Sequence, residues 1–207
     1  MKFSLKKKLV AFMMLVMTCS MLAACGGEDD VASSGVAEEQ VEAVYHHVEI
    51  TVKDYGTIKV ELNETVAPIT VANFIKLAEE GFYDGLTFHR IMNGFMIQGG
   101  DPKGNGTGGS DEKIKGEFSA NGVENNLSHT RGAISMARAK AMDSASSQFF
   151  IMHEDALYLD GLYACFGYVT EGIEIVDAIC KDTPVVDNNG TVLAANQPVI
   201  ESVKVID

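Results

Sequence analysis

The sequence predicts a mainly β domain, a closed antiparallel barrel with two helices that plug its ends. Three features of the 207-residue chain predict this fold: many short segments with strand periodicity, glycine-rich turns between them, and only two stretches with helical periodicity. These features occupy residues 45–207, a length sufficient for one domain with a sizeable core.

The first two strands are predicted to form a hairpin. In "HVEITVKDYGTIKVELN", residues 47–63, apolar and polar residues alternate on both sides of Asp54-Tyr55-Gly56, as is typical of antiparallel strands joined by a tight turn. Residues 102–127 are rich in Gly and Asn, which predicts a long loop. The further predicted strands are "LTFHRI" (86–91), "GFMIQGGD" (94–101), "GAISMARA" (132–139), "SQFFIMHE" (147–154), "YACFGYVT" (163–170) and "PVIESVKVID" (198–207).

The clearest helical segment is "TVAPITVANFIKLAEEGFYDG", residues 65–85. Thr65 is suited to cap this helix, Pro68 to occupy its first turn, and Gly81 to end it. Its apolar residues at helical spacing are Val71, Phe74, Ile75 and Ala78. A second, shorter helix is predicted over "GIEIVDAICK", residues 172–181.

The first 25 residues, "MKFSLKKKLVAFMMLVMTCSMLAAC", carry the pattern of a secretory signal peptide. Four lysines precede an apolar run that is shorter than the roughly 20 residues of a membrane span. The ending "LAAC" resembles the lipobox of bacterial lipoproteins, in which the cysteine receives a diacylglyceryl group and the chain is cut before it. We therefore expect a lipoprotein signal peptide over 1–24 and a lipidated Cys25, with an ordinary signal peptide or an uncleaved anchor as the alternatives.

The stretch that follows, residues 25–44, is acidic and contains no aromatic residue, so it is predicted to be a flexible tether. Removal of residues 1–24 leaves 12 basic residues against 29 acidic ones, a net charge of −17. Such a surface disfavours nucleic acid, because binding to it requires Lys and Arg to neutralise phosphates. It also disfavours adhesion to anionic lipid, so membrane attachment is expected through the acyl chains alone.

Three other kinds of site, for a dinucleotide, for serine hydrolysis and for a metal, are disfavoured by the sequence. "GNGTGG", residues 104–109, matches G-x-G-x-x-G, but the segment after it is acidic, is broken by Gly116, and does not open the helix that a dinucleotide site needs. The serines within 144–147 lie near His153 and Asp155 without a nucleophile elbow, so a hydrolase is disfavoured. No cluster of side chains has metal-ligand spacing, and no metal is expected.

Two cysteines lie in the predicted domain, Cys165 in "YACFGYV" and Cys180 in "VDAICKD". Their apolar neighbours predict two buried free thiols. The oxidising exterior that a signal peptide implies would also permit a disulfide between them.

Six segments together resemble the cyclophilin-type peptidyl-prolyl cis/trans isomerases, in the order of that family. They are "FHRIMNGFMIQGGD", "GNGTGG", "GEF", "ISMARA", "SQFFI" and "LDGLYACFGYV". The resemblance spans about residues 47–206. It implies an eight-stranded barrel capped by two helices, an active groove on the outer face of the barrel, and isomerisation of Xaa-Pro bonds without a cofactor.

The resemblance also implies roles for particular residues of this chain. The catalytic arginine falls on Arg90, with Gln98 as its catalytic neighbour. The residues of the proline pocket fall on Phe95, Met96, Phe150, Leu159 and Tyr163. The contacts to the peptide fall on Gln98, Ala137, Arg138 and Gln148, and the pocket rim falls on Tyr158.

The chemistry of this reaction suits such a set. Rotation about an amide meets a barrier of about 18–20 kcal/mol, and twisting the C–N bond localises a lone pair on the prolyl nitrogen. A cationic donor aimed at that nitrogen stabilises the twisted state more than the planar one, which is what catalysis requires. Arg90 stays charged and offers a rigid fork. Gln98 is expected to orient the guanidinium if the strands that carry the two residues are neighbours.

Alternation along the strand allows only one of Phe149 and Phe150 to face the groove, and the resemblance selects Phe150. The sequence also departs from the familiar eukaryotic members at three positions. Tyr158 stands where many of them carry Trp, Tyr163 where they carry His, and Arg138 where they carry Asn. These changes put sensitivity to cyclosporin in doubt and leave Arg90 unchanged.

The predicted protein is therefore an extracytoplasmic, lipid-anchored isomerase that assists the folding of exported proteins at the membrane surface. Its expected partners are proline-containing peptides and unfolded exported chains, its expected location is the outer face of the plasma membrane, and its expected state is a monomer. The inner face of an outer membrane is the other possible location. The alternative function is a peptide-binding chaperone or scaffold in which turnover is incidental.

Overall fold

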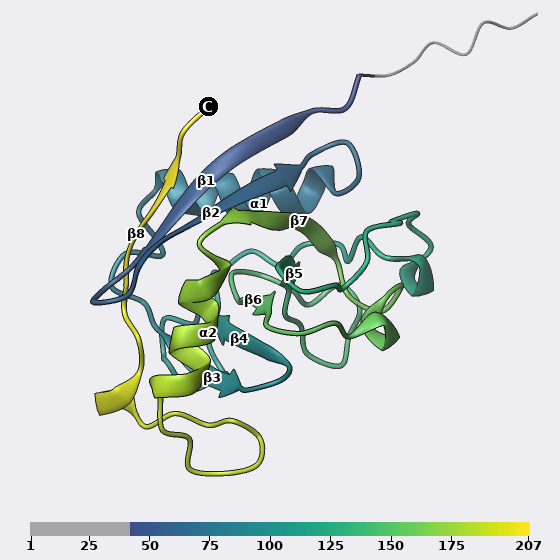
Figure 1. Ribbon diagram of the computed structural model, residues 1–207. Coiled ribbons are helices and arrows are strands. Elements are labelled where there is room, and N and C mark those ends of the chain that lie inside the picture. Colours follow the sequence, from purple (N-terminus) through teal and green to yellow (C-terminus); the bar gives the residue numbers. More distant parts are fainter. Residues whose placement is uncertain (1–41) are drawn as a thin grey trace, which may run out of the picture. The chain divides into compact units, whose positions relative to one another are not determined.

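A computed structural model describes residues 42–207, and the structural statements below concern that part of the chain. Eight antiparallel strands form one curled sheet in the order β3-β4-β6-β5-β7-β2-β1-β8 (Figure 1). The strands are β1 (Tyr45–Val52), β2 (Gly56–Asn63), β3 (Phe88–Met92), β4 (Met96–Gly99), β5 (Ala133–Met136), β6 (Phe149–Met152), β7 (Cys165–Glu171) and β8 (Ile200–Val205). The predicted mainly β class is confirmed.

The sheet is a half-barrel, and the predicted closure is not supported. Its edge strands, β3 and β8, form no ladder with each other, and a single isolated bridge joins Thr87 to Val199 beside them. Pro198 has no amide hydrogen with which to extend this pairing. At the start of β3 the Phe88 amide donates to the Pro198 carbonyl, and further along, its outer edge is hydrogen-bonded to the loop 190–192, which there takes the place of a closing strand.

Two α-helices pack on the sheet, α1 (Pro68–Glu79) on β2 and β8, and α2 (Ile173–Asp182) on β2, β3 and β4 (Figure 1). Pro68 occupies the first turn of α1, as predicted. Gly81 follows the end of α1 with a φ of +68°, a conformation that glycine adopts without strain.

The predicted capping of α1 by Thr65 is wrong. The Thr65 hydroxyl accepts a hydrogen bond of 2.7 Å from the Val44 amide and makes no bond to the helix. The buried Glu117 carboxylate accepts the amides of Ile69 and Thr70 at 3.0 and 2.7 Å. A negative charge is favourable at a helix N-terminus, so this contact also holds the 102–127 loop against α1.

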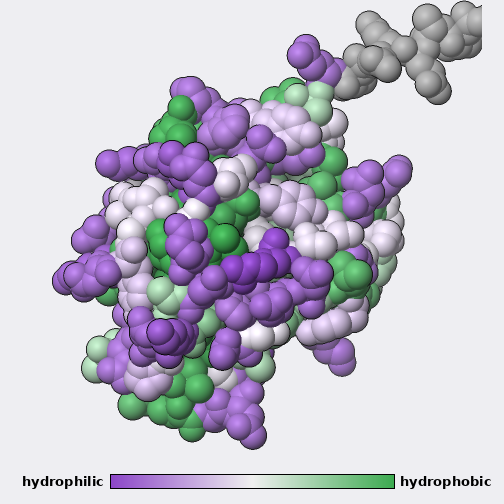
Figure 2. Space-filling view, in the orientation of Figure 1, coloured by the Kyte–Doolittle hydropathy of each residue, from purple (hydrophilic) through white to green (hydrophobic). Residues whose placement is uncertain are grey.

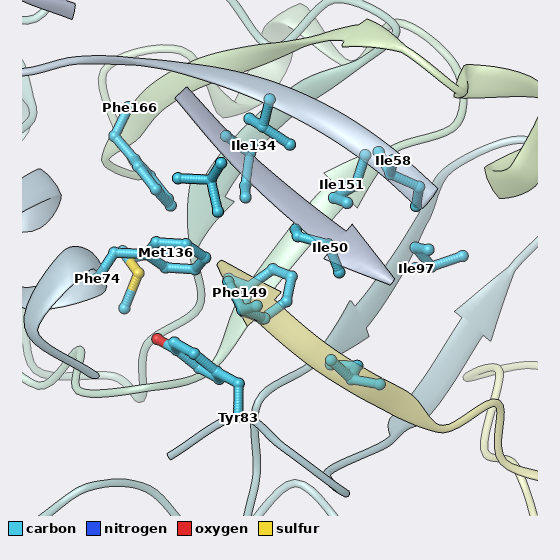
Figure 3. Packing of buried hydrophobic residues seen from close by; sticks show 14 of the residues in the cluster. Ile50, Ile58, Phe74, Tyr83, Ile97, Ile134, Met136, Phe149, Ile151 and Phe166 are labelled. Carbon is cyan, nitrogen blue, oxygen red and sulfur yellow. The ribbon is translucent and has the colours of Figure 1, made fainter. Parts of the chain in front are cut away.

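The two faces of the sheet carry separate apolar clusters. On the inner face, helix residues and strand residues form the main core, in which the Phe149 ring lies 5.4 Å from that of Phe74 and 5.6 Å from that of Tyr83 (Figure 3). The outer face carries a smaller cluster that includes Met96 and Phe150. Phe149 therefore faces the main core and Phe150 faces the outer side of the sheet, as the alternation along this strand predicted.

Within residues 42–207 no helix is long and apolar enough to cross a membrane. The predicted signal peptide 1–24, Cys25 and most of the tether 25–44 lie outside the described residues. Polar side chains cover most of the face of the domain in Figure 2, with apolar patches between them.

Cys165 and Cys180 are buried free thiols. Burial raises the pKa of each thiol to about 12, so both stay protonated at neutral pH. Neither has the depressed pKa that a reactive cysteine needs.

Candidate active site

A cavity of about 230 Å³ opens on the outer face of the sheet, and strands β3, β4 and β6 supply much of its wall. Nine of the predicted site residues line it, namely Arg90, Phe95, Met96, Gln98, Ala137, Arg138, Phe150, Leu159 and Tyr163. The structure therefore brings residues from four separate parts of the chain to one pocket.

Strand register places the central side chains of this pocket. Arg90 of β3 is the direct partner of Gln98 on β4, and Gln98 is in turn the partner of Phe150 on β6. Met96 lies two residues before Gln98 and faces the same side of the sheet. A shift of one residue in either ladder would send these side chains to the inner face.

The Arg90 guanidinium is held by three acceptors. Its Nε donates to the Asn189 carbonyl at 2.8 Å, Nη1 to the Gln98 Oε1 at 3.3 Å, and Nη2 to the Met92 sulfur at 3.0 Å. Gln98 was predicted to orient the guanidinium if the two strands were neighbours. β3 and β4 are neighbours, and Gln98 contacts the guanidinium. A guanidinium has five N–H groups, so two remain available to a ligand in the pocket.

Burial lowers the pKa of Arg90, and the nearby Tyr163 and Asp187 oppose this effect. Arginine remains charged at every physiological pH despite such a shift. The partly desolvated cation therefore acts at short range with little screening by water.

A chain of hydrogen bonds runs from Arg90 through Gln98 to Gln148. The Gln98 Nε2 donates to the Gln148 Oε1 at 2.9 Å, and the Gln148 Nε2 donates to the Gly108 carbonyl at 2.7 Å. Gln148 does not line the first pocket. It lines an adjoining cavity of about 320 Å³ together with Gln98, Arg138 and the loop 106–110.

The apolar wall is rigidly supported. Phe150 packs edge-on against Tyr163, with ring centroids 5.9 Å apart, and the buried Met96 and Leu159 belong to the same outer cluster. Tyr158 stacks on Phe95 at 6.2 Å and is 69% exposed, so it lies beside the pocket and does not line it.

Most N–H donors of Arg138 are bonded to nearby backbone carbonyls. Its Nε and Nη2 donate to the Leu162 carbonyl at 3.1 and 2.8 Å, and its guanidinium lies 4.7 Å from the Tyr163 ring centroid. The same guanidinium lies 5.1 Å from the Phe118 ring. Arg138 thus fixes the wall of the pocket in addition to lining it.

The other motifs form no second site. The 104–109 segment is a loop, and the Ser147 hydroxyl donates to the Gly100 carbonyl. The His153 Nδ1 accepts a hydrogen bond from the Gly94 amide, so it is not aligned with a serine. Among residues 42–207 there is no group of three or more His, Cys, Asp or Glu side chains placed to hold a metal.

His129 is a site-supporting residue that the sequence analysis missed. Its fully buried ring stacks on Phe150 with centroids 6.0 Å apart, and it bonds Asp160 at 2.8 Å and Ser135 at 3.1 Å. Asp160 lies 31 residues further along the chain, so no local pattern could have revealed the pair.

We expect His129 to make the domain less stable as the pH falls. Burial lowers the pKa of His129, and the bond to Asp160 offsets only part of this effect. A histidine with a depressed native pKa contributes stability that is present above its unfolded pKa of about 6.5 and is lost as the pH falls below it. The midpoint temperature of thermal unfolding should therefore decrease as the pH is lowered from 7 to 5. This decrease should be smaller in His129→Gln. Parallel curves for the two proteins would contradict this assignment.

The site thus joins a cavity of about 230 Å³, walled by aromatic and aliphatic side chains, to a held, partly desolvated guanidinium, a combination suited to noncovalent binding. The comparisons with known proteins identify the family. The model of the family "Cyclophilin type peptidyl-prolyl cis-trans isomerase/CLD" matches residues 47–205. This chain belongs to the cyclophilin-type peptidyl-prolyl cis-trans isomerases.

Individual relatives support the same conclusion. Peptidyl-prolyl cis-trans isomerase B of Bacillus subtilis is 52% identical over 122 residues, which cover 59% of this chain and 82% of the relative. A peptidyl-prolyl cis-trans isomerase of Helicobacter pylori is 42% identical over 153 residues, which cover 73% and 90%.

Solved structures from Cryptosporidium parvum agree as well. A cyclophilin-type isomerase from that organism has a TM-score of 0.70 and 30% identity, and the match covers 79% of this chain and 99% of the relative. The structure of that isomerase in the presence of the dipeptide Ala-Pro has a TM-score of 0.68, with 78% and 99% covered.

Proposed function

We propose that Arg90 catalyses cis-trans isomerisation of Xaa-Pro bonds by stabilising the twisted imide. The observation that carries this proposal is the half-buried guanidinium, held at three N–H groups, at the edge of an apolar pocket. The pocket formed by Met96, Phe150 and Leu159 holds the prolyl ring while the acyl side of the bond rotates.

The reaction breaks no bond between heavy atoms, so it needs no nucleophile and no proton transfer. As the C–N bond twists, its resonance is lost and the prolyl nitrogen gains a lone pair. One of the two N–H groups of Arg90 without a protein partner donates to that lone pair, in the twisted state only. Because the planar cis and trans forms lack this acceptor, the interaction lowers the barrier and hardly changes ground-state binding.

The substrates are proposed to be extended chains with apolar residues beside the proline. Leu157, Tyr158 and Leu162 are exposed on one short turn next to the pocket, and Tyr158 reaches the pocket wall through its stack on Phe95. Exposed apolar side chains that adjoin a pocket indicate an interaction surface. Unfolded chains present such residues, whereas folded proteins bury them.

We further propose that the enzyme acts on exported proteins as a lipoprotein on the outer face of the plasma membrane, and as a monomer. The support for export and lipidation is the signal sequence that ends in "LAAC" and the strongly acidic sequence after it. Acyl chains on Cys25 would then be the only membrane attachment, since a basic surface patch is not available to an enzyme of this charge.

A protease-coupled assay on an Ala-Pro peptide tests the proposed activity. The wild-type enzyme is expected to accelerate the cis-to-trans step far above the uncatalysed exchange, which takes roughly tens to hundreds of seconds. Peptide binding without any rate above background would contradict the proposal and favour a peptide-holding chaperone or scaffold.

Cys25→Ser should release the protein from membranes. The serine hydroxyl cannot replace the thiol that receives the lipid, and loss of the acyl chains removes nearly all membrane affinity. The measurement is the partition of the expressed protein between membrane and soluble fractions, with Cys180→Ser as the matched control. Unchanged partition of Cys25→Ser would contradict the lipid anchor and leave the isomerase proposal untouched.

A further inference from the structure

Two loops that lie far apart in the sequence are linked to the Arg90 guanidinium by hydrogen bonds, one through two glutamine side chains and the other directly. The first, 101–109, contains the glycine-rich motif, and the second, 187–191, follows α2 and runs beside β3 (Figure 1). Each loop is organised around one aspartate side chain that accepts backbone amides.

Asp101 organises the first loop from inside. It is 1% exposed, and its Oδ1 accepts the Lys103 amide at 2.8 Å while its Oδ2 accepts the amides of Asn105 and Gly106 at 3.1 and 2.6 Å. Burial alone would raise the pKa of Asp101, but these amides more than offset it and lower the pKa. Asp101 is therefore a buried anion whose two oxygens are both in use.

The close packing around Asp101 explains part of the glycine motif. A Cβ atom on Gly108 would collide with the Asp101 carboxylate, so only glycine fits there. The loop thereby presents the Gly108 carbonyl to the Gln148 side chain.

That carbonyl sets the direction of every hydrogen bond from there to Arg90. Gln148 must turn its Nε2 toward the Gly108 carbonyl, which leaves its Oε1 facing Gln98. Gln98 must then turn its Nε2 toward Gln148, which leaves its Oε1 for the Arg90 Nη1. Without the carbonyl, either amide could flip and present a donor to the cation.

Asp187 organises the second loop with a single oxygen. Its Oδ1 accepts the amides of Asn189 and Thr191, each at 3.0 Å. The Asn189 carbonyl, which these bonds position, accepts the Arg90 Nε at 2.8 Å.

We propose that Asp101 and Asp187 are positioning residues for Arg90, Asp101 through the Gly108–Gln148–Gln98 path and Asp187 through the Asn189 carbonyl. This inference rests on the proposed role of Arg90. Assays of the wild type and Arg90→Ala test that role separately, so its failure can be told from a failure of this inference.

The two aspartates should respond differently to the same substitutions. Asp101→Asn replaces one accepting oxygen with a donor that faces backbone N–H groups, so it should lower kcat as much as Asp101→Ala, by about tenfold, since small displacements of a catalytic group have effects of this order or larger. Asp187→Ala should lower kcat by a similar factor, but Asp187→Asn should lower it clearly less because one oxygen is enough to hold both amides there.

The matched control is Asp143→Ala, to be compared with Asp101→Ala. Asp143 also holds a loop, by accepting the Gly116 amide at 3.0 Å and the Asn121 Nδ2 at 2.7 Å, but none of its bonds leads to Arg90. This variant should retain the wild-type kcat. An equal loss of kcat in the control would mean that loose loops alone slow the enzyme, and it would overturn the inference.

Two readouts separate positioning from a structural effect. In an Arg90→Lys background, Asp101→Asn should change kcat less than about twofold, because contacting residues of one network are not additive. The Arg90 Nε–H resonance should shift and exchange faster with water in Asp187→Ala, and less so in Asp187→Asn. The proposal would be overturned if Asp101→Asn caused the same tenfold loss in the Arg90→Lys background as in the wild type, or if the Nε–H resonance were unchanged in Asp187→Ala.

Discussion

Replacing Arg90 with alanine is expected to lower kcat/KM for an Ala-Pro peptide by about 10²–10³-fold, the usual effect of removing one donor aimed at transition-state charge. The loss should fall mainly on kcat, because the proposed hydrogen bond forms only in the twisted state. The protease-coupled assay measures both parameters.

Arg90→Lys is the matched control for this prediction. Lysine keeps the positive charge but lacks the planar fork that contacts Asn189, Gln98 and the substrate together, so its kcat should lie between those of the wild type and Arg90→Ala. Full activity in Arg90→Ala would refute the proposed role of the guanidinium.

The second large effect is on stability. Phe149→Ala should lower the free energy of unfolding by about 3–5 kcal/mol, because it empties a fully buried site among the rings of Phe74 and Tyr83. This is a large share of the roughly 5–15 kcal/mol that stabilises a typical domain. Urea titration followed by far-UV circular dichroism measures it.

The adjacent residue supplies the comparison. Phe150 lies on the outer face of the sheet in the pocket wall, so Phe150→Ala should raise KM strongly and destabilise the domain less than Phe149→Ala does. If the two variants were equally destabilised and equally active, the separation of the two faces of β6 would be wrong.

The sequence predicted the elements of the fold because their signals are local. The hairpin of β1 and β2 follows from alternation around Asp54, and the start of α1 follows from Pro68. The open edge beside β3 could not be predicted, because it depends on a loop about one hundred residues away that takes the place of a strand. The cap of α1 was missed for the same reason, since Glu117 lies 47 residues from Thr70.

The site residues were placed by the resemblance to a family and not by periodicity. Alternation alone restricted Phe149 and Phe150 to opposite faces, and the structure then brought Arg90, Gln98 and Phe150 together by register. The contact of His129 with Asp160 is tertiary, and so are the bonds that link the Gly108 and Asn189 carbonyls to Gln148 and Arg90. No residue pattern in one segment reports them.

Exchange of a saturating Xaa-Pro peptide on the enzyme, measured by NMR line shapes, tests the central claim most directly, because it separates peptide binding from rotation of the bound bond. We expect Arg90→Ala to bind the peptide with an affinity within a few-fold of the wild type and to interconvert its bound cis and trans forms about 10²-fold or more slowly. Bound exchange at the wild-type rate in Arg90→Ala would contradict the account, since a guanidinium that the rotating bond does not need cannot be its catalyst.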